Sequence, residues 1–176
     1  MTSEPNTRNA ADEFVAATID ALRNEKGVHI ETAIAATARM AGTFLFRSFG
    51  FQLADAEPGS AVLSDRANEK GPMLIDIVGQ KLTAANLVPG PGTLEMEPGE
   101  EHRPHLSFLE SQQKLEPSYD AIRRRWGLSL EDGAKAAAEA VGSLIVQGSQ
   151  VLDPGIAFNI AAFGFVEGSK TLPADI

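Results

Sequence analysis

The spacing of hydrophobic residues follows a helical period along most of this chain. From residue 9 to residue 24, large apolar side chains recur every three to five positions, and charged side chains fill many of the positions between them. This pattern is typical of a helix with one buried face, and Gly27 supplies an end signal. Residues 1–8 are polar and include Pro5, so we expect a loose arm before this helix.

A second helix, predicted over residues 30–49, is apolar on nearly every side. Its middle, residues 32–46, reads TAIAATARMAGTFLF and carries one charge, Arg39, in fifteen residues. The segment 155–166, GIAFNIAAFGFV, carries no charge at all and follows a helix start signal, an aspartate before a proline. Helices of this kind are buried on several sides. We therefore expect both segments to lie at the centre of a fold or of an assembly.

Proline and glycine divide the rest of the chain into further helices. We expect a short helix near 61–68, a helix over 72–86, a helix from residue 105 that stops or bends at Pro117 and continues to 126, and a helix over 129–147 capped by Ser129. No segment alternates with a two-residue period and β-branched enrichment, so no sheet is predicted. The pattern predicts an all-α fold, a helical bundle of six to seven helices.

The segment 88–104 is the predicted linker. It reads VPGPGTLEMEPGEEHRP, and its four prolines and its glycines oppose both helix and central strand. It separates residues 9–87 from residues 105–172. A chain of 176 residues suits one compact domain, so we predict a single helical domain over 1–176 in which these two units pack together.

Two stretches 100 residues apart resemble each other. Residues 19–46 align without a gap on residues 119–146, with eight of 28 positions identical, and the aligned pair Gly27 and Gly127 ends a helix in each. The order of the predicted elements also matches. Convergence of two alanine-rich helices is the alternative. We predict a duplication, in which two three-helix units pack around a pseudo-twofold axis.

Composition narrows the classes of function. The chain has no cysteine, which excludes disulfides, thiolate metal sites and a cysteine nucleophile, and fits a cytoplasmic protein. A formal net charge of −9 opposes nucleic acid or an anionic membrane surface as a partner. No apolar run reaches the roughly 20 residues of a membrane span. Phosphate-loop, dinucleotide, zinc-protease and nucleophile-elbow motifs do not occur in the sequence, so no enzyme class has positive support.

Three residues are candidate ligand contacts. Arg39 and Arg47 are eight residues apart on one face of an apolar helix, where two guanidinium groups can clamp a carboxylate or phosphate at a pocket edge. The alternatives are exposure to solvent or a pair with a glutamate of another helix, for which Glu139 is aligned with Arg39. Asn159 lies in the uncharged last helix, so once buried it is either a structural hydrogen-bonding node or a ligand contact.

Histidines raise the question of a metal site. His102 and His105 follow a group of glutamates, at positions 95, 97, 100 and 101, and such side chains together can bind a divalent cation. Pro104 keeps the two histidines off one helix face, so we favour a solvated acidic linker and predict no metal and no cofactor. His29 begins the second helix, where we expect it to pack in the capping region.

Association is the last prediction. A bundle of six or seven helices cannot easily bury two helices that are apolar on most faces, so we predict a symmetric homodimer that covers part of this surface.

The favoured function is a non-enzymatic helical protein that self-associates and acts as an interaction or small-ligand-binding module. The alternative is an enzyme that holds a small anionic substrate between the two units with Arg39 or Arg47, which requires a pocket at one of these arginines.

Overall fold

The computed structural model describes residues 3–88 and 99–176, and six α-helices account for most of these residues. Their order along the chain is α1 (Ser3–Leu22), α2 (Ile30–Ser48), α3 (Asp65–Ala84), α4 (Phe108–Arg125), α5 (Leu130–Gly148) and α6 (Pro154–Ser169), with a short 3-10 turn, η2 (Glu100–His102), before α4. Within the described ranges the only β pairing consists of two isolated bridges. The predicted all-α class is confirmed.

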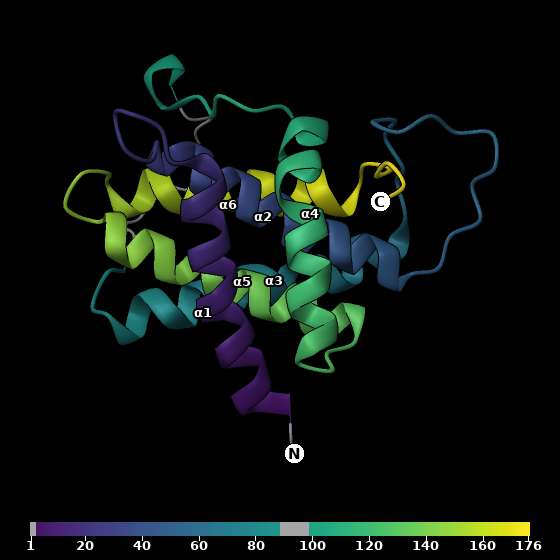
Figure 1. Cartoon of the computed structure of the whole chain (residues 1–176), viewed down its shortest axis with the longest axis horizontal. Coiled ribbons are helices and arrows are strands. Elements are labelled where there is room, and N and C mark those ends of the chain that lie inside the picture. Colours follow the sequence, from purple (N-terminus) through teal and green to yellow (C-terminus); the bar gives the residue numbers. More distant parts are fainter. Residues whose placement is uncertain (1–2, 89–98) are drawn as a thin grey trace.

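The helix α2 is the centre of the bundle. It packs most extensively against α6 and α5, and it also contacts α4. In Figure 1, α1 and α4 lie beside each other in front of the other four helices, and α1 also packs on α5. The helix α3 contacts α5 and α6. No described helix is long and apolar enough to cross a membrane.

Both helices predicted to be central are covered within a single chain. Every residue of α2 from Thr32 to Phe46 is buried except Arg39, and most of α6 is buried too. Gly42 allows these two helices to pack closely, because a Cβ at this position would lie 2.6 Å from the backbone nitrogen of Ser169 on α6. The charge-free pattern thus predicted burial correctly, and α2 needs no partner subunit to cover it.

Two predicted boundaries on the first half of the chain are wrong. The first helix begins at Ser3, so the segment expected to be a loose arm is helical from there. The two helices expected near 61–68 and over 72–86 are one helix, α3, capped by the Ser64 hydroxyl, which accepts a hydrogen bond from the Ala67 N–H at 3.2 Å. Pro72 lies inside α3 on an exposed face, where water can bond the carbonyl that proline leaves unpaired.

The start of α4 also differs from the prediction. The helix begins at Phe108 because Ser107 and Glu110 form a capping box, in which Ser107 Oγ accepts the Glu110 N–H at 3.2 Å and Glu110 Oε2 accepts the Ser107 N–H at 2.7 Å. The helix then continues through Pro117 to Arg125 without a break. Pro117 is exposed, so solvent again replaces the missing bond.

The remaining helix predictions agree with the structure. The second helix begins at residue 30 as expected, Ser129 caps α5, and the Asp153 carboxylate caps α6 by accepting the N–H groups of Gly155 and Ile156. Residues 89–98 of the predicted linker lie outside the described residues. Its final residues carry η2 and lead into the loop before α4.

Candidate functional site

Arg39 is bonded within the protein. Its Nε donates to Glu167 Oε2 on α6 at 2.6 Å, and its Nη1 donates to the Leu106 carbonyl at 2.7 Å and to Ser111 Oγ at 3.0 Å. The side chain is 11% exposed. Arg39 therefore connects α2 to α6 and to the start of α4. Its carboxylate partner is Glu167 and not Glu139, which the sequence alignment of the two halves suggested.

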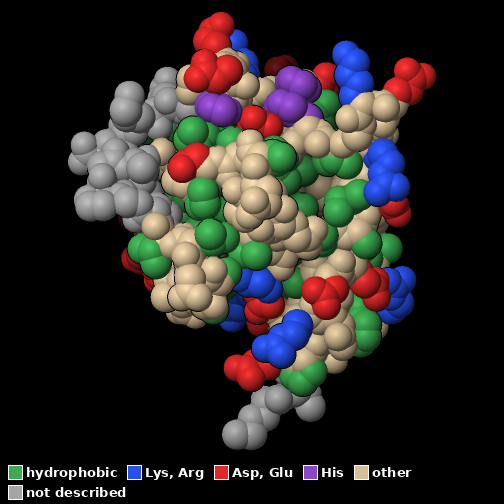
Figure 2. Space-filling view, turned by 90° about the vertical axis from the view of Figure 1, so that its left-hand side faces the viewer, with side chains coloured by type: hydrophobic (Ala, Val, Ile, Leu, Met, Phe, Trp, Pro, Cys, Tyr) green, Lys and Arg blue, Asp and Glu red, His purple; other side chains and the backbone are tan. Residues whose placement is uncertain are grey.

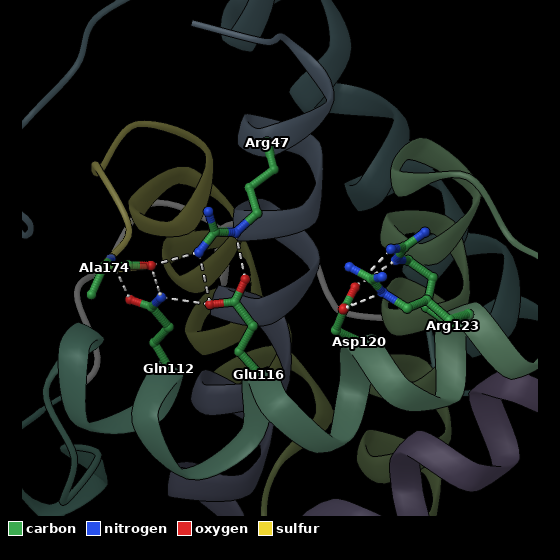
Figure 3. Close-up of polar contacts among 7 residues, drawn as sticks. Arg47, Gln112, Glu116, Asp120, Arg123 and Ala174 are labelled. Carbon is green, nitrogen blue, oxygen red and sulfur yellow. Dashed lines mark hydrogen bonds and ion pairs between the residues drawn. The ribbon is translucent and has the colours of Figure 1, made fainter. Parts of the chain in front are cut away.

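Arg47 makes a second connection, eight residues further along α2. Figure 3 shows its side chain directed at Glu116 on α4 and at Ala174 in the C-terminal segment. Its Nε donates to Glu116 Oε1 at 2.5 Å, and its Nη2 donates to Glu116 Oε2 at 3.1 Å and to the Ala174 carbonyl at 2.6 Å. Gln112 completes the network by bonding both Glu116 and the backbone of Ala174. Glu116 is fully buried.

The three predicted ligand contacts do not converge on one place. Arg39 and Arg47 lie on the same side of α2, but each guanidinium has its own carboxylate. Asn159 is buried on α6, and it is not without a partner. A ligand-binding role for these three residues stays a prediction. Any anion at either arginine would have to compete with a carboxylate that is already bonded at 2.6 Å or less.

A buried hydroxyl cluster joins three helices, and the sequence pattern did not reveal it. Tyr119 of α4 is fully buried, and its hydroxyl lies 2.6 Å from Thr18 Oγ1 on α1 and 3.2 Å from Thr37 Oγ1 on α2. Its ring stacks on Phe14 with centroids 4.2 Å apart. Burial raises the pKa of Tyr119 to about 12, although the hydrogen bonds from Thr18 and Thr37 act in the opposite direction. The phenol therefore serves the core as a neutral hydrogen-bonding group.

All three histidines of the chain gather at one end of the bundle, around the start of α2. Figure 2 shows histidine side chains at the top of one face, beside acidic and basic groups. The rings of His29 and His105 stack with centroids 3.8 Å apart. Glu31 lies between His29 and His102, with 3.2 Å from its Oε2 to His29 Nε2 and 3.1 Å from its Oε1 to His102 Nδ1. The sequence placed His29 in a cap and did not connect it to the other two.

The charge states of this group follow from its surroundings. Burial lowers the pKa of His29 most, the neighbouring Glu31 raises it, and His105 and His102 lower it further. For Glu31 burial raises the pKa, but bonds from its own backbone N–H and from His102, with the charges of His29 and His102, outweigh burial and lower the pKa overall. The most favourable state near neutral pH is thus a charged Glu31 beside an uncharged His29.

The described part of the chain contains no donor set for the metal site considered from the sequence. There, no group of three or more histidine, cysteine, aspartate or glutamate side chains is arranged to hold an ion. Glu95 and Glu97, which belonged to that hypothesis, lie outside the described residues. His102 Nδ1 is hydrogen-bonded to the Glu31 carboxylate at 3.1 Å, and His29 Nε2 lies 3.2 Å from the same carboxylate.

Exposed apolar surface gathers where α6 lies against α3. Phe163 and Val166, three residues apart on one face of α6, are 56% and 48% exposed. Beside Val166 is a cavity of about 190 Å³, lined largely by apolar groups that include Pro72 and Ile75 of α3. A shallower hollow of about 570 Å³ begins at Ile75 and reaches Phe158. We call the surface formed by Phe163, Val166, Pro72 and Ile75 the α3–α6 face.

Three features of this protein are therefore candidates for function: the two bonded arginines of α2, the histidine group at the start of α2, and the α3–α6 face. Each is defined by contacts between helices far apart in the sequence. Comparison with known proteins adds no assignment to this geometry. No model of a protein family, no curated protein and no solved structure matches this chain significantly.

Proposed function

We propose that this chain is a non-enzymatic helical interaction module that self-associates as a symmetric homodimer through the α3–α6 face. The observation that carries the proposal is the exposure of Phe163 and Val166 on a helix that is otherwise buried and apolar. A large aromatic side chain more than half exposed beside an apolar cavity gains free energy when a second surface covers it. In a twofold dimer the same side chains from both copies would meet.

Charge supports a second copy as the occupant of this face. Each copy carries a formal charge of −9, so two copies repel one another over most approaches. The helix α6 has no charged residue from Pro154 to Val166, and the next one, Glu167, is bonded to Arg39. Two chains can therefore approach through α6 with less like-charge repulsion than through an average part of their surface.

The state of the two arginines favours an interaction module over an enzyme. An enzyme that holds an anionic substrate needs a guanidinium free to accept it in a pocket. Arg39 and Arg47 instead hold Glu167 and Glu116, at 2.6 Å and 2.5 Å, and so connect α2 to its neighbours. This arrangement is the one expected where arginines stabilise a helical scaffold. The enzymatic alternative consequently has less support than it had from the sequence.

Mass measurement tests the proposal. Light scattering after size exclusion, at tens of micromolar protein, should give about twice 18.7 kDa for the natural chain. The double variant Phe163→Ser with Val166→Ser should run as a single 18.7 kDa chain, because its α6 surface no longer gains from burial. Val151→Ser is the control, since Val151 is 80% exposed but lies in the loop between α5 and α6.

Two results would refute self-association through this face. A natural chain that stays at 18.7 kDa over the whole concentration range would exclude the dimer. A dimer that survives the double variant but dissociates in Val151→Ser would place the contact elsewhere. Helical content measured by circular dichroism should remain unchanged in both variants, because the substituted side chains are exposed.

We also propose that the fold arose by duplication of a three-helix unit. Gly27 and Gly127 both have positive φ, 100° and 65°, in the loops that follow α1 and α4. The packing is reciprocal: α1 contacts α5 as α4 contacts α2, and Gly42 approaches α6 as Gly142 approaches α3. An experimental structure whose two units failed to superpose with helices in matching order would contradict a duplication.

The absence of cysteine from the chain supports the cytoplasm as its compartment.

A further inference from the structure

A cavity of about 260 Å³ lies against the stacked histidines, where the end of α1 meets the start of α2 and the loop before α4. Six of its lining residues are polar or charged: Arg23, Asn24, His29, Thr32, His105 and Lys114. None of the residues that line it is acidic, although the chain has 24 acidic residues against 15 lysines and arginines. The lining therefore carries the two positive charges of Arg23 and Lys114, and Glu31, which lies 3.2 Å from His29, is not part of it.

The two strong cations at this cavity make no direct contact with a carboxylate among the described residues, although the charge of Lys114 adds to the Ser107 hydrogen bonds that lower the pKa of the nearby Glu110 carboxyl. In the described part of the chain neither Arg23 nor Lys114 takes part in a side-chain hydrogen bond or an ion pair. Arg123 provides a contrast. It follows Asp120 by three residues, as Arg23 follows Asp20, but Arg123 bonds Asp120 at 2.7 Å. Figure 3 shows the Asp120–Arg123 pair on α4. Arg23 thus keeps its donors available at the cavity.

Contacts at the start of α2 position the His29 ring. Its Nε2 lies 3.2 Å from Glu31 Oε2. Its Nδ1 and Thr32 Oγ1 share a hydrogen bond of 2.7 Å, and Thr32 Oγ1 also accepts the His105 backbone N–H at 2.9 Å. These bonds hold the His105 loop against α2. They place the His105 ring over His29, at the wall of the cavity.

We propose that this cavity is a binding site for a small oxyanion, a carboxylate or phosphate group, which Arg23 and Lys114 hold beside the rings of His29 and His105. The two cations supply charge-assisted hydrogen bonds, and His29 can supply a further donor as it gains a proton. A volume of about 260 Å³ suits a small group and not a drug-sized ligand. This site is separate from the α3–α6 face and does not depend on self-association.

Binding of an anion here depends on pH in a defined direction. His29 faces Glu31 on its own helix, His102 and Glu101 belong to η2, and Lys114 and Arg23 lie across the cavity. Without an anion, a proton on His29 is opposed by burial of its ring and by the neighbouring histidines, so its pKa is lowered. A bound oxyanion offsets this effect, so protons and anion should bind together. Affinity for the anion is therefore expected to rise as the pH falls from 7.5 to 6.0.

The test is a titration followed by NMR, in which the three histidine ring signals can be resolved individually. Sulfate is the probe for a phosphate-like group because its charge stays constant over this pH range, and acetate is the probe for a carboxylate. Sodium chloride at equal ionic strength is the salt control. We expect saturable shifts of the His29 and His105 ring signals with at least one oxyanion, and at least threefold tighter binding at pH 6.0 than at pH 7.5.

Charge-removing variants locate the site. Arg23→Gln and Lys114→Gln should each weaken binding about tenfold, as expected for the loss of one charge-assisted contact. Arg8→Gln is the matched control, because Arg8 is an exposed arginine of α1, fifteen residues before Arg23, which lies just past the end of that helix. Saturable sulfate binding with no acetate binding would identify a phosphate-type site, and the reverse would identify a carboxylate site.

Three outcomes would overturn the proposal. The first is a linear shift that chloride reproduces at equal ionic strength. The second is equal weakening by Arg23→Gln and Arg8→Gln, which would show that only net charge matters. The third is affinity that does not change with pH, which would exclude the histidines from the site. All three variants concern exposed side chains, so loss of folding is not expected to confuse the comparison.

Discussion

The Nε atom of Arg47 lies 2.5 Å from Oε1 of Glu116, a carboxylate on α4 that no solvent reaches. The second carboxylate oxygen of Glu116 accepts from Arg47 Nη2 and from Gln112 Nε2, so both oxygens are bonded. A buried carboxylate with both oxygens occupied by donors is stable only while its cation remains. The pair therefore fixes the relative position of α2 and α4, and through Ala174 it also holds the C-terminal segment.

Removal of one partner from this pair is expected to be costly. Glu116→Leu or Arg47→Met should each lower the free energy of unfolding by about 3 kcal/mol, because each leaves a charge in or near the interior without its partner. The double variant Arg47→Met with Glu116→Leu should lose less than the two single losses added together. Urea unfolding followed by circular dichroism measures all three. A double variant that loses the full sum would show that the two residues act independently.

Glycine substitutions should separate close packing from helix propensity. Gly42→Ala is expected to cost about 2 kcal/mol, because its Cβ would lie 2.6 Å from Ser169 N and 2.7 Å from Phe165 O on α6. Gly79→Ala in α3 should instead stabilise by about 0.5–1 kcal/mol, since no atom lies within 4 Å of its Cβ position. Calorimetric melting temperatures should move in opposite directions. Unchanged stability in Gly42→Ala would mean that α2 and α6 can separate freely.

Tyr119 gives a direct optical measure of core integrity, because it is the only tyrosine in the chain. Its pKa is raised to about 12 by burial, whereas an unfolded tyrosine ionises near pH 10. The stability that this difference contributes is fully present below pH 10 and is lost as the pH rises toward 12. Ultraviolet absorbance should therefore show tyrosinate near pH 10 in urea but only near pH 12 in the folded protein. Ionisation near pH 10 in the folded state would contradict burial.

A milder substitution tests the hydroxyl cluster itself. Tyr119→Phe keeps the ring stacked on Phe14 and removes only the hydroxyl, so we expect a loss of about 1 kcal/mol of unfolding free energy. The loss stays small because Thr18 and Thr37 lie 3.2 Å apart and can bond each other. Urea unfolding compares this variant with the natural chain. A loss as large as that of a core truncation would show that the hydroxyl bonds matter more than the ring.

Stability should fall in acid in two steps. The pKa of His29 is lowered in the fold, so below pH 6.5 the unfolded chain binds its proton first and stability decreases until the folded His29 is protonated too. The pKa of Glu31 is also lowered, so its contribution is present above pH 4.5 and is lost as the pH falls through its folded pKa. Melting temperatures between pH 3 and pH 8 measure both steps.

Variants assign the two steps to their residues. His29→Gln should remove the step just below pH 6.5, and Glu31→Gln should reduce the step at lower pH. Glu25→Gln is the control for the second variant, because Glu25 is an exposed glutamate near the same end of α2. If His29→Gln left the step below pH 6.5 unchanged, His29 would not be its source.

The elements that the sequence predicted well have local causes. The boundaries of α5 and α6 follow from Ser129 and Asp153, whose side chains accept the first N–H groups of each helix. The start of α4 had an equally local signal, Ser107 with Glu110 three residues later, which identifies the capping box. Proline misled the prediction at Pro72 and Pro117. Both prolines face solvent, and water satisfies the carbonyl that a buried proline would leave unpaired.

The candidate sites had no such signals. His29 and His105 stack although 76 positions separate them, and only the course of the loop before α4 brings them together. The partner of Arg39 was equally hidden, because the arginine bonds Glu167 at a distance of 128 positions along the chain. A spacing rule identifies neighbours on one helix, but it carries no information about which helix lies opposite.

By itself the sequence determined that this chain is helical and that residues 32–46 and most of residues 155–166 lie in its interior. Helical period and lack of charge are properties of a segment, and burial is the only way for such segments to leave water. Only the tertiary structure decided which side chains meet. It paired Arg47 with Glu116, placed no carboxylate of the described residues in contact with Arg23, and left Phe163 exposed on a mostly buried helix. Those outcomes depend on how six helices pack against one another, since each contact joins residues from separate elements.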